Sequence, residues 1–264
     1  MRAFVRVSLV ALLLFALPAP LPAQAETVDL VLALVADVSR SIDEREFELQ
    51  KKGYLTAFTD PRVVAAIRGG PIGAIAVCYI EFASAHEVKT VLDWVVVRDE
   101  ASARAFAEAI YAAPRSYWGR TAIGTAIDHA VKTIAGAGHD APRRVIDVSG
   151  DGTNNAGRDI TIARDDAVEA GITVNGLVIL NESAAPWQRD HVNPPGGLRK
   201  YYQDHVAGGS GNFVLEAKDF ASFGEAMTRK LIFEIAALPS PVKASRVHVI
   251  IPSRIMAISG HNPG

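Results

Sequence analysis

Apolar residues along the chain alternate between continuous runs and helical spacings. Residues 28–36 (VDLVLALVA) form an unbroken β-prone run, as expected for a central strand covered on both faces. From residue 43 to residue 58 the apolar side chains recur at helical intervals, which predicts a helix directly after that strand. This alternation continues along most of the chain and is typical of an α/β domain with a mainly parallel sheet.

The later elements follow the same pattern. Two strand-like runs, residues 72–82 and 88–97, are joined by a short polar link, which implies a hairpin and one antiparallel edge strand. The remaining predicted strands are 144–149, 172–179 and 212–215, and the predicted helices are 61–68, 101–112, 122–135, 160–170, 198–206 and 220–235. The sequence therefore predicts a doubly wound α/β fold with six strands, one of them antiparallel at an edge, and helices on both faces.

The first 25 residues predict export. Arg2 and Arg6 give a positively charged start, residues 7–21 are apolar but interrupted by two prolines, and residues 23–25 (AQA) match the pattern cut by signal peptidase. The apolar run is shorter than the roughly 20 residues of a membrane-spanning helix. We therefore predict a cleavable signal peptide cut after Ala25, a periplasmic or secreted product, and no membrane insertion of the mature chain.

The rest of the chain is predicted to be one domain, residues 26–237, followed by a loosely ordered tail, residues 238–264. Removal of the signal peptide takes away two basic residues and no acidic residue, so the formal charge changes from −2 to −4. This mildly acidic balance argues against nucleic acid or an anionic membrane as the main partner. The single cysteine, Cys78, lies in an apolar run and is predicted to be a buried thiol.

The strongest local signal lies where the first predicted strand gives way to the first helix. Asp37, Ser39 and Ser41 stand there in a D-x-S-x-S pattern. Ligands of open α/β sheets bind at the carboxyl ends of the strands, and a carboxylate with two hydroxyls offers the hard oxygen ligands that suit Mg²⁺, Mn²⁺ or Ca²⁺. Asp and Ser are also common helix N-cap residues, so helix capping is the alternative interpretation.

Two later segments favour the metal interpretation. Thr121 precedes a predicted helix that begins at Ala122, which leaves its hydroxyl available to a metal. Asp151 follows the predicted strand 144–149 between two glycines, which allow the tight backbone that brings a carboxylate to a cation. Asp147 lies inside that strand, where a buried carboxylate needs hydrogen-bond partners. We predict Asp151 as the metal-facing residue and Asp147 as a supporting or structural one.

These segments resemble, in the same order and on the same elements, the metal-ion-dependent adhesion site of von Willebrand factor A and integrin inserted domains. The matching residues are Asp37, Ser39 and Ser41 in the first motif, Thr121 in the second and Asp151 in the third. The resemblance covers residues 28–235. It departs from the family at the third motif, which usually reads Thr-Asp-Gly after an unbroken apolar strand but here reads DVSGDG over residues 147–152.

Residues 151–155 (DGTNN), 201–206 (YYQDHV) and 230–235 (KLIFEI) are further similar to a bacterial family of secreted, A-domain-like proteins whose function is not established. The adhesion-site resemblance implies that an Asp or Glu of a protein ligand completes the coordination of the metal. We therefore expect an exported binding module that holds a divalent cation, with Mg²⁺ as the first choice, and binds an acidic residue of a partner protein through it.

The polar insertion after the fifth predicted strand is expected to reach the metal face. It carries Trp187, Arg189 and His191, and Trp118 stands just ahead of the second motif. Aromatic and arginine side chains are frequent anchors of protein interfaces, so we predict these four residues as the partner-binding rim. The alternative is that both tryptophans pin their own loops to the body of the domain.

Enzymatic interpretations have less support. The sequence has no G-x-S-x-G elbow and no P-loop, and its glycine-rich stretch, residues 136–141, follows a helix and precedes a strand, the reverse of a dinucleotide site. A phosphatase-like hydrolase that uses Asp37 and Asp151 with a metal is one alternative, although no general base is evident. A structural subunit with a vestigial metal site is the other. We predict a protein that is not an enzyme.

Overall fold

The computed structural model of the protein describes residues 25–181 and 188–236. The predicted tail, Trp187 and all of the predicted signal peptide except Ala25 lie outside these residues. Within the two described ranges, no helix is long and apolar enough to cross a membrane.

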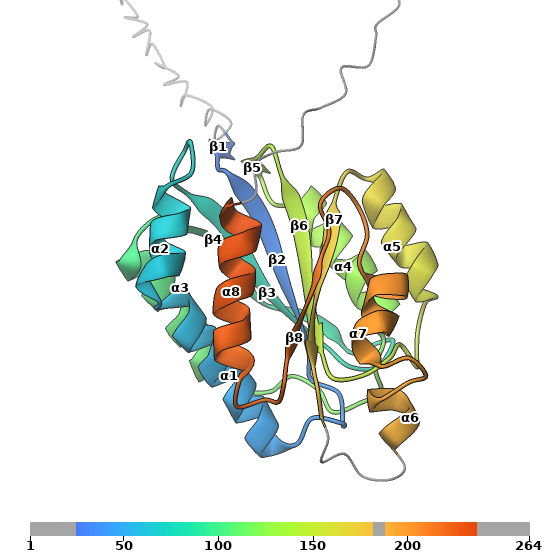
Figure 1. Cartoon of the computed structure of the whole chain (residues 1–264). Coiled ribbons are helices and arrows are strands. Elements are labelled where there is room, and N and C mark those ends of the chain that lie inside the picture. Colours follow the sequence, from blue (N-terminus) through green and yellow to red (C-terminus); the bar gives the residue numbers. More distant parts are fainter. Residues whose placement is uncertain (1–24, 182–187, 237–264) are drawn as a thin grey trace, which may run out of the picture.

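Six strands form one sheet in the order β4-β3-β2-β6-β7-β8 (Figure 1). Neighbouring strands are parallel except for β3 and β4, which pair antiparallel at one edge. The strands are β2 (Leu30–Asp37), β3 (Ile75–Phe82), β4 (Val88–Val97), β6 (Arg144–Gly150), β7 (Thr173–Ile179) and β8 (Val214–Ala217). The predicted doubly wound α/β fold with one antiparallel edge strand is confirmed.

Helices cover both faces of this sheet (Figure 1). The helices on one face are α1 (Glu44–Phe58), α2 (Pro61–Arg68), α3 (Glu100–Ala112) and α8 (Phe223–Ala236). Those on the other face are α4 (Ile123–Ala135), α5 (Ile160–Glu169) and α7 (Leu198–Tyr201), which continues as the π-helix η2 (Tyr202–Val206). The central strand β2 is therefore buried along its whole length, with Leu32 and Leu34 facing the first layer and Val31 and Val35 the second.

The structure adds three short elements that periodicity did not predict. These are β1 (Glu26–Thr27) and β5 (His139–Asp140), which pair parallel in a small separate sheet, and α6 (Arg189–Val192). An element of two to four residues is too short to display a helical or strand period, so its sequence carries no such signal. Cys78 lies buried in β3, as predicted.

The helices α1 and α8 approach each other closely at Gly53. A Cβ atom at Gly53 would lie 2.2 Å from Cδ1 of Phe223 and 3.0 Å from the backbone nitrogen of Gly224. The Phe223 ring is fully buried and meets the Tyr54 ring edge-on, with 5.2 Å between the ring centroids. The space that a side chain would need at Gly53 is thus already filled by a ring with little freedom to move.

We predict that Gly53→Ala destabilises the protein although alanine favours helices. The gain in helix propensity is about 1 kcal/mol, whereas overpacking a filled core costs about 1 to 3 kcal/mol or more, so the free energy of unfolding should fall in urea denaturation. Gly136→Ala is the matched control, because the atom nearest to its Cβ is 3.7 Å away. Equal stability of the two variants would contradict the tight α1–α8 contact.

Candidate metal centre

Five predicted ligand residues meet at the carboxyl-terminal end of the central strands. Asp37 ends β2, and Asp151 directly follows β6, the parallel neighbour of β2. Ser39 and Ser41 lie in the loop from β2 to α1, and Thr121 precedes α4. All five side chains are buried. We call these residues the candidate metal centre.

Hydrogen bonds connect the side chains of this centre into a chain. Thr121 Oγ1 donates to Ser39 Oγ (3.0 Å), the Ser39 and Ser41 hydroxyls are 3.1 Å apart, and Ser41 Oγ donates to Asp151 Oδ1 (2.7 Å). Asp37 Oδ1 accepts from the backbone N–H of Ser39 (2.7 Å). The second oxygen of Asp37, Oδ2, is buried and has no hydrogen-bond partner among the described residues.

These hydrogen-bond distances are also compatible with oxygens that share one small cation. Ligands on adjacent corners around Mg²⁺ lie about 2.9 Å apart, given metal–oxygen distances of about 2.0 to 2.1 Å, and the linked donor atoms of the centre are spaced by 2.7 to 3.1 Å. The orphan oxygen of Asp37 also favours a bound cation, because buried polar atoms are rarely left unsatisfied. In the described ranges no three His, Cys, Asp or Glu residues gather as metal ligands, so this centre depends on its hydroxyls.

Helix capping does not account for the D-x-S-x-S segment. The N-cap of α1 is Asp43, whose carboxylate accepts from the backbone of Glu46 while the Glu46 side chain accepts from the backbone of Asp43. The N-cap of α4 is Ala122, so the Thr121 hydroxyl is not a cap either. The capping interpretation of this segment is therefore wrong, and its hydroxyls are directed at one another and at Asp151.

Burial raises the pKa of both carboxyl groups of the centre. The pKa of Asp37 rises to about 8, mainly because its charge is removed from water and secondly because Asp151 repels it. The pKa of Asp151 rises to about 6, again mainly through burial, while hydrogen bonds from Ser41 and Asn181 oppose the shift. A divalent cation would stabilise both ionised forms and so oppose both shifts.

Arg115 supports the candidate metal centre by holding its serine loop, and this role was not predicted from the sequence. Its guanidinium donates to the backbone carbonyls of Val38 (2.6 Å), Ser39 (2.7 Å) and Ile42 (3.0 Å), which holds the loop that carries both serines. It also stacks on the Trp118 ring, 3.7 Å from the ring centroid. An arginine that binds carbonyls through tertiary contacts leaves no mark in the local sequence, so no pattern identifies this residue.

Two asparagines also contact the centre without having been predicted. Asn181 Nδ2 donates to Asp151 Oδ2 at 3.4 Å, and Asn155 Oδ1 accepts from the backbone N–H of Thr121 at 2.9 Å. The only sequence signal for them was position, since Asn155 lies just after the third motif and Asn181 just after β7.

The predicted rim residues lie at different distances from the centre. His191 contacts it directly, with Nε2 3.2 Å from Thr121 Oγ1, and burial together with Arg40 and Arg120 lowers its pKa to about 4. Trp118 is 53% exposed and stacks on Arg115. Arg189 is exposed on α6, outside the pocket described next.

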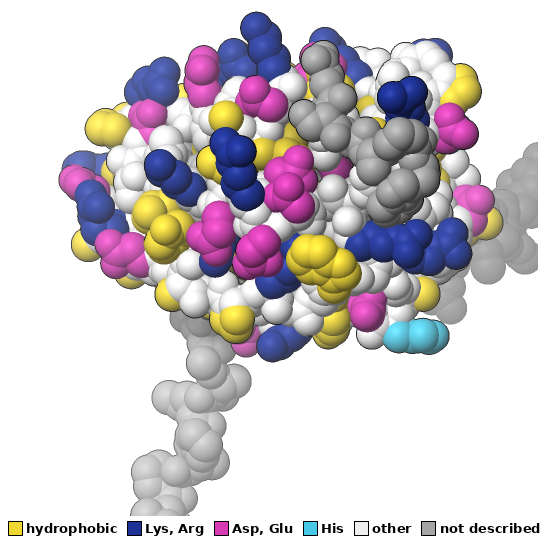
Figure 2. Space-filling view, turned by 90° about the horizontal axis from the view of Figure 1, so that it is seen from below, with side chains coloured by type: hydrophobic (Ala, Val, Ile, Leu, Met, Phe, Trp, Pro, Cys, Tyr) yellow, Lys and Arg dark blue, Asp and Glu magenta, His cyan; other side chains and the backbone are white. Residues whose placement is uncertain are grey.

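A pocket of about 100 Å³ opens at the centre. It is lined by Ser41 and Thr121 of the centre and by Arg40, Gly119, Arg120, Asn155, Gln188 and His191. Figure 2 views the molecule from this end and shows basic and acidic side chains interspersed around it. The positive charge near the centre therefore comes from the pocket itself and not from a uniformly basic face.

Asp147, the competing aspartate, belongs to a different cluster. Its carboxylate is buried in β6 and lies 2.8 Å from the Lys230 ammonium on α8, which also pairs with Glu234. Burial, followed by repulsion from Glu234, raises the pKa of Asp147 to about 7. Asp147 therefore ties α8 to β6 instead of facing the candidate metal centre.

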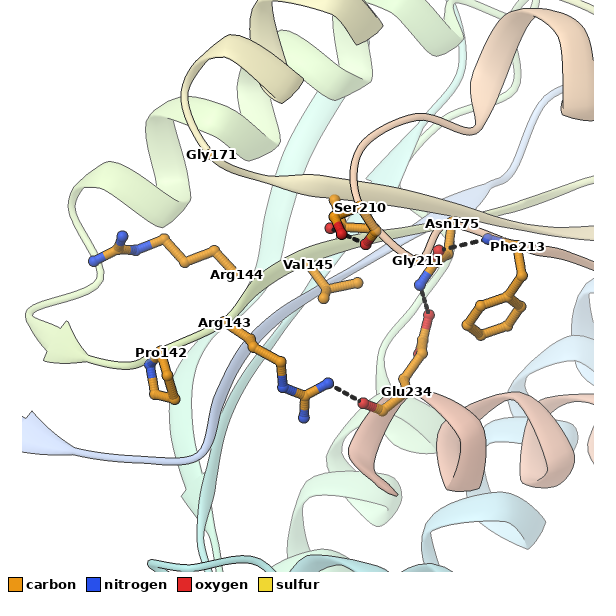
Figure 3. A pocket seen from close by; sticks show the side chains of 11 residues that line it. Pro142, Arg143, Arg144, Val145, Gly171, Asn175, Ser210, Gly211, Phe213 and Glu234 are labelled. Carbon is orange, nitrogen blue, oxygen red and sulfur yellow. Dashed lines mark hydrogen bonds between the residues drawn. The ribbon is translucent and has the colours of Figure 1, made fainter. Parts of the chain in front are cut away.

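Asp147, Lys230 and Glu234 form what we call the Lys230 cluster. Through Glu234, this cluster borders a second pocket, of about 200 Å³, at the opposite end of the strands (Figure 3). Glu234 points towards Asn175 there and accepts its hydrogen bond (2.9 Å), and Arg143 reaches the last turn of α8, where it donates to the carbonyls of Glu234 and Ile235. The polar groups of this pocket are thus used mainly to anchor α8 to the sheet.

The sheet order, the two helical layers and the position of the hydroxyl–carboxylate centre define a von Willebrand factor A fold. The chain belongs to the family described as protein of unknown function DUF1194, whose model matches residues 27–239. A comparison with curated proteins gives no match.

Solved structures share this fold at low sequence identity. Proximal thread matrix protein 1 from the mussel byssus, with a zinc-occupied MIDAS motif, aligns at 20% identity and a TM-score of 0.53, over 81% of this chain and 49% of that one. A von Willebrand factor type A protein from Catenulispora acidiphila aligns at 16% and 0.51, over 80% and 43%. The pilus adhesin SpaC from Lactobacillus rhamnosus GG aligns at 11% and 0.52, over 80% and 32%. The chain thus spans at most about half the length of each.

We predict that metal-induced stabilisation grows as pH rises. The folded-state pKa values of Asp37 and Asp151, about 8 and about 6, lie above the ordinary value of 3.8. Their contribution to metal-free stability is therefore full below that value and is lost as pH rises through the folded values, whereas a cation needs the ionised forms.

The measurement is the melting temperature at about pH 5, 6.5 and 8, with and without Mg²⁺. The metal-free value should fall with pH, partly through Asp147, whose pKa is also raised. The increase on adding metal isolates the candidate centre and should become larger across this range. An increase that is independent of pH would contradict the assignment of these two carboxylates.

Proposed function

We propose that the mature protein is an exported binding module that holds a divalent cation at the candidate metal centre and binds an acidic side chain of a partner protein through it. The observation that carries this proposal is the convergence of three hydroxyls and two carboxylates. Thr121, Ser39, Ser41 and Asp151 are linked at 2.7 to 3.1 Å, and one oxygen of Asp37 is left unpartnered among the described residues. Export rests on the predicted signal peptide, residues 1–25.

Each residue of the centre would contribute to the cation in its own way. Ser39, Ser41 and Thr121 would hold it through neutral hydroxyls, and Asp37 and Asp151 through carboxylates, partly by way of water as the resemblance implies. A divalent cation supplies an electrophilic contact for a ligand oxygen. Because every donor of the centre is a hard oxygen, Mg²⁺ is the first choice, with Mn²⁺ and Ca²⁺ as alternatives.

The pocket at the centre supports an acidic ligand. Arg40 and Arg120 line it together with Ser41 and Thr121, so an anion entering the pocket would meet positive charge and the metal centre at once. A volume of about 100 Å³ suits a single carboxylate group. Trp118 and Arg189 are exposed and lie outside this pocket. We propose them as contacts of the partner, together with Trp187, which is not among the described residues.

A binding or structural role is also consistent with the fold relatives, which include a thread matrix protein and a pilus adhesin. We therefore propose that the protein is not an enzyme. The metal-dependent hydrolase is the second interpretation, and turnover of phosphate esters with Mg²⁺ or Mn²⁺ would favour it over the binding module.

We predict that the mature protein binds one Mg²⁺ or Mn²⁺ per chain and that Asp151→Asn weakens this binding by more than about 100-fold. The measurement is titration calorimetry with Mg²⁺, Mn²⁺ and Ca²⁺ in turn. Asp190→Asn is the control, because it removes an exposed acid of α6 that is not part of the centre. If no ion binds to a protein with a native circular dichroism spectrum, the metal centre is excluded.

Acidic-ligand binding gives a separate prediction. A short peptide with one glutamate should bind the metal-loaded protein, and its glutamine counterpart and the metal-free protein should show no such binding. Arg120→Ala should weaken peptide binding by about twofold to fivefold, as expected for an exposed charge. It should not weaken Mg²⁺ binding, because it removes a positive charge from the pocket. Arg104→Ala, on α3, is the matched control. Equal binding of both peptides would contradict an acidic ligand.

A further inference from the structure

The His191 ring packs against the candidate metal centre, in space that a glycine leaves open. A Cβ atom on Gly152 would lie 2.1 Å from His191 Nε2, so only glycine at position 152 leaves room for this imidazole. The ring nitrogens face different surroundings, since Nε2 is 3.2 Å from Thr121 Oγ1 and Nδ1 is 3.1 Å from Thr153 Oγ1. Which nitrogen carries the proton decides what His191 offers to the centre.

Asn155 settles this question. Its Oδ1 accepts from the backbone N–H of Thr121 (2.9 Å), which fixes the orientation of the amide and leaves Nδ2 3.2 Å from His191 Nδ1. An amide nitrogen of asparagine only donates hydrogen bonds. His191 Nδ1 must therefore accept from it, and the Thr153 hydroxyl can donate to the same nitrogen. A proton on Nδ1 would place two donors face to face.

We propose that His191 is a neutral imidazole with its proton on Nε2 and that it donates this proton to Thr121 Oγ1, as a positioning residue of the metal centre. The role of His191 in metal binding rests on the proposed function, whereas the hydrogen-bond arrangement around its ring does not. Thr121 donates onward to Ser39, and Ser41 donates to Asp151, so Ser39 donates to Ser41. All the hydrogen bonds from Asn155 through His191 to Asp151 then run in one direction.

This direction prepares the three hydroxyls for a cation. A hydroxyl has one donor proton and two acceptor positions. Thr121, Ser39 and Ser41 each use the proton on the next member of the chain and one acceptor position on the previous member. Each hydroxyl keeps one acceptor position, and these three are what a hard cation would use.

The same direction limits what His191 itself does. Its lone pair, on Nδ1, faces Thr153 and Asn155 and points away from Thr121. The ring therefore offers the centre a hydrogen-bond donor and neither a nitrogen ligand nor a general base. This separates the protein from a zinc site with a histidine ligand and from a hydrolase in which His191 deprotonates water.

The first test reads the tautomer directly. Two-bond ¹⁵N–¹H NMR correlation of the metal-free mature protein labelled at histidine should assign His191 as the neutral Nε2–H form near neutral pH. The Nδ1–H form or an imidazolium overturns the proposal. This result does not depend on whether any metal binds, so it is distinguishable from failure of the proposed function, which calorimetry of the wild type reports.

The second test uses variants. His191→Ala should weaken Mg²⁺ and Zn²⁺ binding together, by about 10-fold to 100-fold, as for other groups that hold a metal ligand in place. His191→Gln, whose amide N–H can replace Nε2–H, should recover most of the loss. A loss confined to Zn²⁺ that glutamine does not recover would identify His191 as a nitrogen ligand and overturn the proposal.

Discussion

The burial of two carboxylates side by side is the constraint on which the candidate metal centre depends. Asp37 and Asp151 stand at the carboxyl ends of neighbouring central strands, and both side chains are fully buried there. Charge in such a place is stabilised only by hydrogen bonds or by opposite charge. The hydroxyls of Ser41 and of its neighbours supply part of the first, and a divalent cation would supply the second. Burial raises the pKa of both acids, so the hydrogen bonds of the polypeptide offset only part of the cost of burying these charges.

The surroundings are shaped to keep the two carboxylates in this position. A Cβ atom at Gly150 would lie 3.0 Å from Asp37 Oδ2, so glycine is needed where β6 passes the first carboxylate. Arg115 holds the serine loop by its carbonyls and leaves the hydroxyls of that loop to the centre. His191 contacts the Thr121 hydroxyl, at the end of the hydrogen-bond chain opposite Asp151. Backbone space, loop position and hydroxyl direction are thus controlled by three different residues, none of which is itself a proposed ligand.

Sequence reasoning found the parts of this arrangement that are local. The strand and helix periods predicted the sheet. The residues of the D-x-S-x-S segment, Thr121 and Asp151 were expected close together because parallel strands end at the same side of a sheet, and the structure brings them together there. Arg115, Asn155 and Asn181 were missed because each acts through a contact distant in sequence. His191 was predicted as a rim residue, but its contact with Thr121 depends on a helix of four residues that no periodicity predicts. The signal peptide and the tail remain predictions, since they lie almost entirely outside the described residues.

The Lys230 cluster is a second buried acidic pair in the same fold, and there the chain itself supplies a cation. There too, two buried acids, Asp147 and Glu234, lie close together, but α8 brings an ammonium group between them. At the candidate metal centre Arg115 favours the charged forms of Asp37 and Asp151, but its guanidinium donates to the backbone carbonyls of Val38 and Ser39. One lysine ammonium thus contacts the pair of Asp147 and Glu234, and the pKa of Asp147 there is still raised to about 7 by burial and by repulsion from Glu234. At the candidate metal centre the proposed divalent cation would bring the positive charge that Lys230 brings to the other pair.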